Sequence, residues 1–237
     1  MSDVTGKQAL VLGGSRGIGA AIVRRLVKDG AATSFTYSSS PDAAERLANE
    51  TGATAIQADS TDREAVARVI AEQSPLDILV INAGIALFGN PPEVDPSDID
   101  RLIDINVRGP YHAAVDAGQR MNDNGRIIVI GSVNGDRMPF PGGAAYALSK
   151  SAIQGLVRGL ARDFGPRGIT VNNVQPGPVD TDMNPADGPL KDMMHAGMAI
   201  KRHGTPEEIA GMVAYLVGPE AAFVTGAQHT IDGGFGA

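Results

Sequence analysis

The sequence predicts an α/β fold: a doubly wound, mostly parallel seven-stranded sheet flanked by helices on both faces. Two observations lead to this prediction. Short apolar segments alternate with longer amphipathic ones along the chain, and this alternation is typical of parallel sheets with crossover helices. The short segments are also nearly continuous runs of Ile, Val and Leu, as expected for strands that are covered on both faces.

Seven segments have the length and apolar content of strands. They are residues 8–12, 33–37, 54–57, 78–81, 126–130, 170–174 and 228–231. The helix candidates between them are residues 19–28, 42–50, 62–72, 96–106 with an extension through 117, 144–164 and 206–217. Caps support several helix starts, because Ser40-Pro41 and Thr205-Pro206 place proline at the first helical position.

Residues 180–204 interrupt the alternation of strands and helices. The segment contains Pro185, Pro189 and a methionine-rich run from residue 193 to 198. We interpret it as a small mobile flap over the carboxyl edge of the sheet, where loops and ligands meet in this class of fold. A plain connecting loop is the alternative.

A glycine-rich loop joins the first strand to the first helix, and it reads Gly13-Gly14-Ser15-Arg16-Gly17-Ile18-Gly19. In such a loop one glycine permits the tight turn, a second lets the backbone approach a pyrophosphate, and a third allows close helix packing. The helix N-terminus adds free N–H groups and a partial positive charge. The sequence therefore predicts a single Rossmann-type dinucleotide-binding domain over residues 1–237, carrying the flap.

The same loop also spells G-x-S-x-G, the nucleophile elbow of α/β-hydrolases, with Ser15 as the nucleophile. Aspartate and histidine residues follow downstream in the order that a hydrolase needs. In such enzymes, however, the elbow normally follows a later, central strand, and here it follows the first one.

The end of the second strand bears on the choice between NADPH and NADH. An NAD-binding domain places a carboxylate there to hold the ribose 2′-hydroxyl. This chain has Tyr37, Ser38 and Ser39 instead, and Arg16 lies in the glycine loop. We therefore expect NADPH/NADP+ as the coenzyme, with an exposed turn as the alternative. Asp59, after the third strand, is placed either to meet the adenine amino group or to cap the next helix.

Tyr146 and Lys150 lie one turn apart on the predicted helix 144–164 and so share a face. A phenol loses its proton near pH ~10, and a nearby ammonium favours the phenolate, so we expect Lys150 to lower the pKa of Tyr146. Ser132 is placed to hold a substrate oxygen while Tyr146 gives or takes its proton. With a hydride donor, these groups suit carbonyl/alcohol redox chemistry. Many helices nevertheless carry this spacing without any catalytic role.

Composition excludes several classes of function. The formal net charge of −7 argues against a nucleic-acid polymer as partner. The chain has no cysteine, and its histidines are scattered without ligand spacing, so neither disulfides nor a metal site are expected. No export signal opens the sequence, and no apolar stretch reaches the roughly 18–20 residues that span a bilayer. We expect a cytoplasmic protein without a membrane partner.

From about residue 6 to the C-terminus, the chain resembles the short-chain dehydrogenase/reductase family. The resemblance rests on the glycine loop and on four further motifs: Ile81-Asn82-Ala83-Gly84, Asp104-Ile105-Asn106-Val107, Ile130-Gly131-Ser132 with Tyr146 and Lys150, and Pro176-Gly177-Pro178-Val179-Asp180-Thr181. Leu12 and Ile81 depart from the family pattern, because each replaces a polar side chain. We expect these two departures to loosen local hydrogen bonding.

The resemblance implies a catalytic set of Asn106, Ser132, Tyr146 and Lys150. Ser132 steadies the carbonyl oxygen, Tyr146 protonates it, Lys150 binds the ribose hydroxyls, and Asn106 holds a water that links Lys150 to solvent. The implied coenzyme contacts are Gly13, Ser15, Arg16, Gly17, Ile18, Gly19, Tyr37, Ser38, Ser39, Asp59, Ser60, Asn82, Ala83, Gly84, Tyr146, Lys150, Pro176, Gly177, Val179 and Thr181.

Asn134, Met138 and Phe140 lie between the serine and the tyrosine and are expected to line the substrate side. The substrate itself stays open among small or aromatic ketones, acyl thioesters and sugars. In relatives, the helix equivalent to residues 144–164 pairs with its copy across a two-fold axis. A homotetramer is therefore expected by analogy.

Residues 131–139, 198–204, 224–227 and 235–237 are similar to a member of this family that binds cyclic-di-GMP and promotes biofilm dispersal. This similarity suggests an alternative function, a cyclic-di-GMP-binding regulator on the same fold. The intact set of Asn106, Ser132, Tyr146 and Lys150 favours retained catalysis, because a binder without catalysis would be free to lose these residues.

Overall fold

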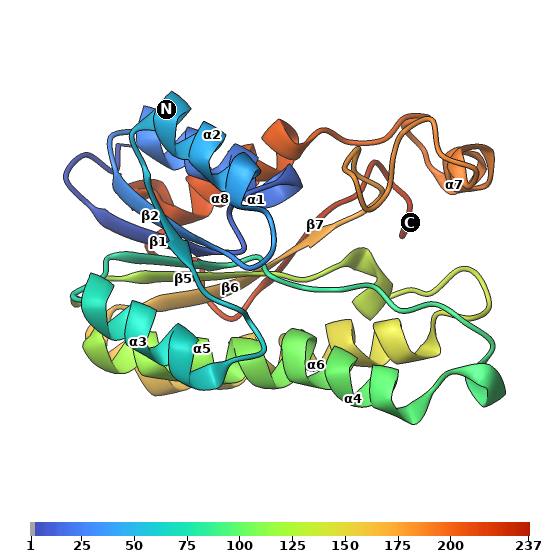
Figure 1. The fold of residues 1–237 in the computed structure, drawn as a ribbon, viewed down its shortest axis with the longest axis horizontal. Helices are drawn as coiled ribbons and strands as arrows, with labels where there is room; N and C mark the ends of the chain where they lie inside the picture. Colours follow the sequence, from blue (N-terminus) through green and yellow to red (C-terminus); the bar gives the residue numbers. More distant parts are fainter. Residues whose placement is uncertain (1–2) are drawn as a thin grey trace.

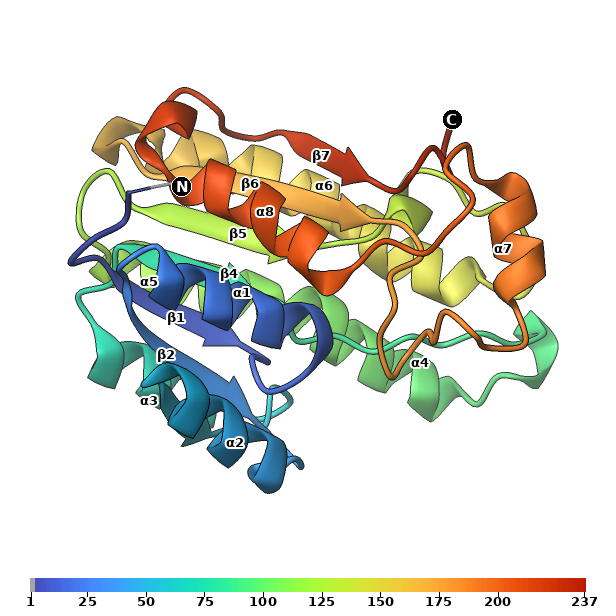
Figure 2. The ribbon, with the colours of Figure 1, turned by 90° about the horizontal axis from the view of Figure 1, so that it is seen from above.

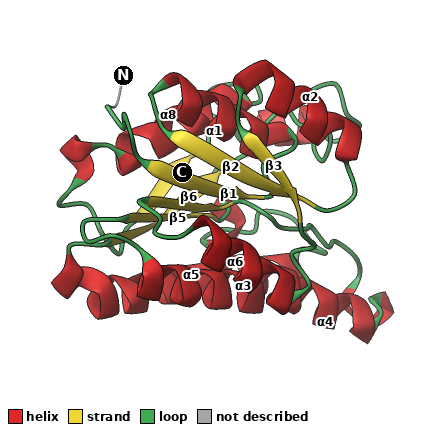
Figure 3. Cartoon of the chain, turned by 60° about the vertical axis from the view of Figure 1, so that its left-hand side comes forward, coloured by secondary structure: helices red, strands yellow, loops and turns green. Residues whose placement is uncertain are grey.

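The computed structural model describes residues 3–237; Met1 and Ser2, the start of the expected domain, lie outside the described residues. Seven strands form one sheet in the order β3-β2-β1-β4-β5-β6-β7, and every neighbouring pair is parallel. Figure 3 shows the strands between layers of helices. The strands are β1 (Gln8–Leu12), β2 (Ala32–Tyr37), β3 (Thr54–Gln57), β4 (Ile78–Ile81), β5 (Arg126–Ile130), β6 (Thr170–Pro176) and β7 (Gln228–Ile231). The expected doubly wound fold is confirmed.

Two layers of helices cover the sheet (Figure 1). One face carries α1 (Gly17–Lys28), α2 (Pro41–Thr51) and α8 (Pro206–Val217), and the other carries α3 (Arg63–Gln73), α5 (Gly109–Arg120) and α6 (Ala144–Phe164). Successive strand residues point to opposite faces. Val11 and Val80 therefore join the cluster under α1 and α8, whereas Leu10 and Leu79 join the one under α5 and α6.

The helix expected over residues 96–106, with an extension through 117, is present and continues to residue 120. It is divided into α4 (Pro96–Ile103), a π-helical turn (Asp104–Arg108) and α5. The N–H of Gly109 donates to the carbonyl of Asp104, which is the longer hydrogen bond of a π turn. Pro110 explains the interruption, because it has no N–H to donate and its ring crowds the preceding turn.

The helix caps agree in part with the sequence. Thr205 and Glu208 form the reciprocal capping box of α8. Ser40 precedes Pro41 at the start of α2 but makes no side-chain capping bond. Asp62 caps α3 by accepting from the N–H of Ala65, so the expected alternative of Asp59 as the cap of α3 is wrong.

The strand order reverses between β1 and β4, and in such sheets ligands bind at the carboxyl ends near this point. The segment of residues 180–204 lies at this edge (Figure 2). The expected flap contains a short helix, α7 (Lys191–Gly197), and it is joined to the sheet edge by a parallel bridge between Val179 and Gly204. Across residues 3–237, no helix has the length and apolar character needed to cross a membrane.

Candidate active site

Four predicted catalytic residues converge at the carboxyl edge of the sheet. Ser132 follows β5, Tyr146 and Lys150 lie on α6, and Asn106 lies in the π turn before α5. Ser132 and Tyr146 share a side-chain hydrogen bond. The Lys150 ammonium lies 5.8 Å from the centre of the Tyr146 ring and donates to the carbonyl of Ile130 at 3.2 Å.

Asn106 is almost fully buried and anchors the loop after β4. Its Oδ1 accepts from the N–H of Ile85 at 3.0 Å, and its Nδ2 donates to the carbonyl of Ile85 at 2.8 Å and to the hydroxyl of Ser149 at 3.0 Å. The side chain is therefore occupied by protein groups. The backbone carbonyl of Asn106 differs from its side chain. In an α-helix this carbonyl would accept from the N–H of residue 110, but Pro110 has no N–H.

The expected lowering of the Tyr146 pKa by Lys150 is wrong. Burial raises the pKa of Tyr146, and the hydrogen bond with Ser132 lowers it by less. Burial also lowers the pKa of Lys150 from 10.5 to about 8. Both shifts have one cause: a low-dielectric site disfavours the charged form of each group. The phenol therefore stays protonated at neutral pH.

The three residues expected on the substrate side have different surroundings. The N–H of Asn134 donates to the Ser132 hydroxyl at 3.1 Å, so this residue orients the serine. Met138 packs over Gly143, where an added Cβ would lie 2.4 Å from its sulfur. Phe140 faces Phe88, with ring centres 5.9 Å apart. Phe88 was not predicted, and its ring also lies 5.3 Å from that of Tyr146.

The glycine loop has the close contacts that its sequence predicts. Gly13 has a φ of 77°, which glycine adopts without strain. A Cβ on Gly19 would lie 2.2 Å from the carbonyl oxygen of Gly13, so helix and loop approach as closely as glycine allows. Asn82 fixes the same carbonyl by donating to it at 2.7 Å. Gly14 was not predicted to matter, yet a Cβ there would lie 2.5 Å from Phe35.

Apart from Tyr146 and Lys150 on α6, the expected coenzyme residues end or follow the carboxyl ends of strands. Tyr37, Ser38 and Ser39 end or follow β2; Asp59 and Ser60 follow β3; Asn82, Ala83 and Gly84 follow β4; and Pro176, Gly177, Val179 and Thr181 end or follow β6. The loop of Gly13, Ser15, Arg16, Gly17, Ile18 and Gly19 joins β1 to α1. The structure thus brings the whole set to one edge of the sheet.

Two contacts connect the glycine loop to the segment after β6. The methyl group of Thr181 faces Gly17, where an added Cβ would come within 3.2 Å of it. Arg16 lies 3.6 Å from the carboxylate of Asp182, and both side chains are well exposed. The guanidinium expected to meet a 2′-phosphate therefore has an acidic neighbour from the flap.

Asp59 is held in a turn. Its carboxylate accepts from the N–H and the hydroxyl of Thr61, both at 2.9 Å, and these bonds, with one from Ser38, lower its pKa. Asp59 is therefore ionised at neutral pH and lies beside the end of β2, where the ribose of a coenzyme is expected.

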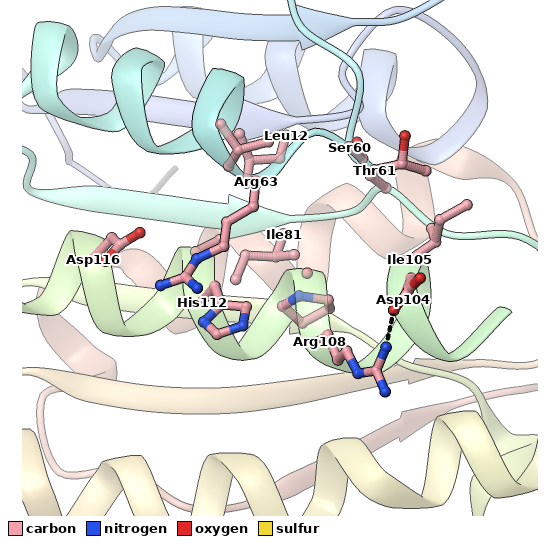
Figure 4. A pocket seen from close by; sticks show the side chains of 15 residues that line it. Leu12, Ser60, Thr61, Arg63, Ile81, Asp104, Ile105, Arg108, His112 and Asp116 are labelled. Carbon is pink, nitrogen blue, oxygen red and sulfur yellow. Dashed lines mark hydrogen bonds and ion pairs between the residues drawn. The ribbon is translucent and has the colours of Figure 1, made fainter. Parts of the chain in front are cut away.

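A cavity of about 240 Å³ opens beside Ser60 and Ala83, two of the expected coenzyme residues (Figure 4). Leu12 and Ile81, the two departures from the family pattern, line it and are register partners in adjacent strands. Both are buried in the apolar cluster under α5 and α6, and the expected loosening of local hydrogen bonding stays a prediction. Arg63 and His112 extend into the cavity from α3 and α5 (Figure 4).

The hydrolase alternative finds no partner for Ser15. Among residues 3–237, no hydrogen bond joins this serine to a histidine. His195 and His203 bond to each other at 2.8 Å, and His229 pairs with Asn172 at 3.4 Å. A nucleophile elbow without a base does not form the required dyad.

The fold and this arrangement define a dinucleotide-dependent oxidoreductase, in which a glycine loop, a buried lysine and a protonated tyrosine meet at one sheet edge. The chain belongs to the short-chain dehydrogenase/reductase family. A family model described as "Enoyl-(Acyl carrier protein) reductase" matches residues 13–236.

Individual relatives are similar over nearly their whole length. The chain is 67 % identical over 237 residues to the cyclic-di-GMP-binding biofilm dispersal mediator protein of Escherichia coli (strain K12), covering 100 % of both chains. A crystal structure of BdcA in complex with NADPH has a TM-score of 0.97 and 68 % identity, covering 98 % of this chain and 96 % of that one. A short-chain dehydrogenase from Burkholderia cenocepacia J2315 in complex with NADP has a TM-score of 0.97 and 45 % identity, covering 99 % and 100 %.

Proposed function

We propose that this chain is an NADPH-dependent reductase that transfers a hydride between the nicotinamide and a carbonyl or alcohol substrate. The observation that carries the proposal is the placement of Tyr146, hydrogen-bonded to Ser132 and one helical turn from the buried Lys150. A general acid must hold its proton at the working pH. The raised pKa of Tyr146 suits protonation of a carbonyl oxygen, and so favours reduction.

The residues at the sheet edge fit NADPH. The glycine loop offers backbone and a helix N-terminus to a pyrophosphate, and Arg16 with the exposed hydroxyls of Ser38 and Ser39 suits a 2′-phosphate. Two similar structures hold NADPH or NADP. When bound, this coenzyme supplies the hydride.

The remaining steps belong to the chain's own side chains. The Ser132 hydroxyl donates to the substrate carbonyl oxygen, held in place by the N–H of Asn134. Tyr146 then transfers its proton to that oxygen. Lys150, with a pKa of about 8, is mostly an ammonium at neutral pH and binds ribose hydroxyls. A water on the backbone carbonyl of Asn106 returns a proton through Lys150.

Tyr146→Phe tests the proposal directly. We expect it to lower kcat/KM for ketone-dependent NADPH oxidation by about 10²–10⁴-fold, since this is what a positioned general acid contributes. NADPH binding, measured by calorimetry, should persist. The matched control is Tyr215→Phe, on the outer side of α8 and 45 % exposed, which should keep full activity. Equal turnover in Tyr146→Phe and wild type would refute the proposal.

The same chain supports a second candidate function, binding of cyclic-di-GMP. The observation in its favour is the identity of 67 % over 100 % of a protein named as a cyclic-di-GMP-binding biofilm dispersal mediator. We propose that a guanine base would occupy the cavity beside Ser60 and Ala83. Arginine forks bind the O6 and N7 acceptors of guanine, and Arg63 lines this cavity.

Because the cavity shares two residues with the expected coenzyme set, cyclic-di-GMP should compete with NADPH. Calorimetry with and without saturating NADPH measures this competition. Arg63→Ala should weaken dinucleotide binding, whereas Arg68→Ala, further along α3 and outside the cavity, should not. A wild type that binds no cyclic-di-GMP would exclude the second function, and the reductase proposal would stand unaffected.

We also propose a homotetramer. Tyr111 on α5 and Leu148 on α6 are 50 % and 61 % exposed, and Gly155 and Gly159 leave open space between the two helices. Small residues beside large exposed apolar ones suit close pairing with a second copy. Light scattering after gel filtration tests this, and Leu148→Glu should dissociate the assembly.

A further inference from the structure

Three aromatic rings lie in a row beside the substrate position. The Phe88 ring lies 5.3 Å from that of Tyr146 and 5.9 Å from that of Phe140, with both pairs tilted by 50°. Tilted pairs at these separations attract each other. Phe88 is still 50 % exposed, so half of this apolar side chain faces open space next to the proton donor. We call Phe88, Phe140 and Tyr146 the aromatic wall.

The backbone holds the wall in place from two sides. Gly89 donates to the carbonyl of Gly142 at 2.9 Å, which ties the loop of Phe88 to the loop of Phe140. On the other side of Phe88, Ile85 is fixed by Asn106 through both its N–H and its carbonyl. The backbone of Phe88 thus lies between two anchored positions, which places its ring beside Tyr146 and Phe140.

Phe140 connects the aromatic wall to buried apolar side chains. Val133, Met198 and Phe235 form a buried cluster, and Phe140 and Met194 pack against it. Neither this cluster nor the aromatic wall contains a charged residue. The guanidinium of Arg137, between Ser132 and Phe140 in the sequence, is engaged with the backbone carbonyl of Ala237.

We propose that the preferred substrates are aryl ketones, in which an aromatic ring is attached directly to the carbonyl carbon. This inference rests on the proposed reductase function and names its substrate class. When the carbonyl oxygen lies between Ser132 and Tyr146, a ring one bond away reaches Phe88. A sugar would lose water from its hydroxyls against the rings without regaining hydrogen bonds, and a linear acyl chain offers no π face.

The reaction of such a ketone balances with the groups already described. A hydride from NADPH forms the new C–H bond at the carbonyl carbon, and the proton of Tyr146 forms the new O–H bond. The ketone is reduced to a secondary alcohol as NADPH is oxidised to NADP+. The product keeps its ring against Phe88, so the wall recognises both directions of the reaction.

The test compares acetophenone with cyclohexyl methyl ketone, which has a saturated ring of similar size. The two ketones differ in intrinsic reactivity, so the quantity of interest is the ratio of their kcat/KM values in each variant. Phe88→Leu should lower the acetophenone preference by roughly 2–12-fold, the loss of one aromatic pair. Phe223→Leu, the same change at a fully exposed phenylalanine, should leave the ratio unchanged.

An unchanged ratio in folded Phe88→Leu would overturn the inference. A second readout separates it from the reductase proposal: saturation-transfer NMR of acetophenone with the NADP+-loaded protein. If wild type binds acetophenone through Phe88 but reduces no ketone, the reductase proposal fails and the aromatic site stands. If ketones are reduced but acetophenone binding ignores Phe88, the aromatic site fails and the reductase proposal stands.

Discussion

The site has two halves that differ in how they are packed: a coenzyme half around the glycine loop and a substrate half beside Tyr146. Around the glycine loop the backbone itself is closely packed: an added Cβ on Gly19 would lie 2.2 Å from the carbonyl oxygen of Gly13, and one on Gly14 would lie 2.5 Å from the Phe35 side chain. Beside Tyr146 the contacts are made by side chains, with ring centres 5.3–5.9 Å apart. The first half leaves no room for an added atom, whereas the second is a surface that single substitutions reshape.

This difference separates what is fixed from what is adjustable. A backbone cradle binds a pyrophosphate in the same way whatever the substrate, because its N–H groups do not change with sequence. A side-chain wall changes its preference with each residue, and so one fold supports many substrates. The substitutions below test whether the two halves respond as unequally as their construction implies.

Gly19→Ala should have the largest effect. The new methyl group meets the carbonyl of Gly13, a backbone atom that also accepts from Asn82 and cannot turn aside. We expect the loop to shift, with NADPH binding weakened by at least about tenfold and the free energy of unfolding lowered by about 1–3 kcal/mol. Calorimetry and urea unfolding measure the two effects.

Gly211→Ala is the matched control, because Gly211 also lies in a helix but a Cβ there would meet only Arg25, at 3.9 Å. It should raise the free energy of unfolding by roughly 0.5–1 kcal/mol, as alanine does in a helix interior. If both variants bound NADPH like the wild type, the coenzyme half would be as tolerant as the substrate half, and the comparison would fail.

The sequence was sufficient for the coenzyme half because its determinants are local. Glycine spacing, apolar strands and a helix start lie within a few residues of one another, and five strands begin and end where the sequence indicated. Asn82 and Ser132 could be placed because each lies within two residues of the end of a strand. Sequence patterns predict an element well when the conformation of a short segment depends on its own residues.

The substrate half depends on contacts between distant segments. Phe88 meets Phe140 and Tyr146 only after folding, and no motif marks it; its one signal was an apolar residue in a loop just after Gly84. The π turn had a clearer signal, the Gly109-Pro110 pair inside a helical pattern. The direction of the Tyr146 pKa shift could not be predicted, because it depends on burial by many residues from distant segments. Helical spacing shows only the nearby lysine.

The pH dependence tests Lys150, which lies where the two halves meet. Burial lowers its pKa from 10.5 to about 8, so the ammonium is lost above that pH. We expect kcat/KM for NADPH, which reports the free enzyme, to be flat below about pH 8 and to fall up to tenfold per unit above it. A profile that stays flat to pH 10 would show that Lys150 keeps its charge.

The same shift affects stability, with a definite sign. Between pH 8 and 10.5 the unfolded chain binds more protons at Lys150 than the folded one, so this group makes the free energy of unfolding rise with pH. Lys150→Met removes that contribution. Urea unfolding of both proteins at pH 8 and pH 10 should show the difference in slope, and parallel slopes would contradict the lowered pKa.

Asp182→Asn should have the smallest effect, because it changes one exposed pair between the flap and the glycine loop. Asp182 lies 3.6 Å from Arg16, and such pairs contribute about 0–1 kcal/mol. Without the Asp182 carboxylate, Arg16 loses its ion-pair partner and a 2′-phosphate loses a repelling negative charge. We expect NADPH to bind about 2–5-fold more tightly, with NADH unchanged because it lacks that phosphate.

Asp187→Asn is the control, since it removes an equal charge from the same segment but Asp187 makes no ion pair among residues 3–237. High salt should abolish the gain from Asp182→Asn, because exposed charges are screened. An equal gain for NADH and NADPH would show that Arg16 does not meet the phosphate. The coenzyme preference would then depend on Ser38 and Ser39. The charge of Arg16 would serve only to pair with Asp182 in the flap.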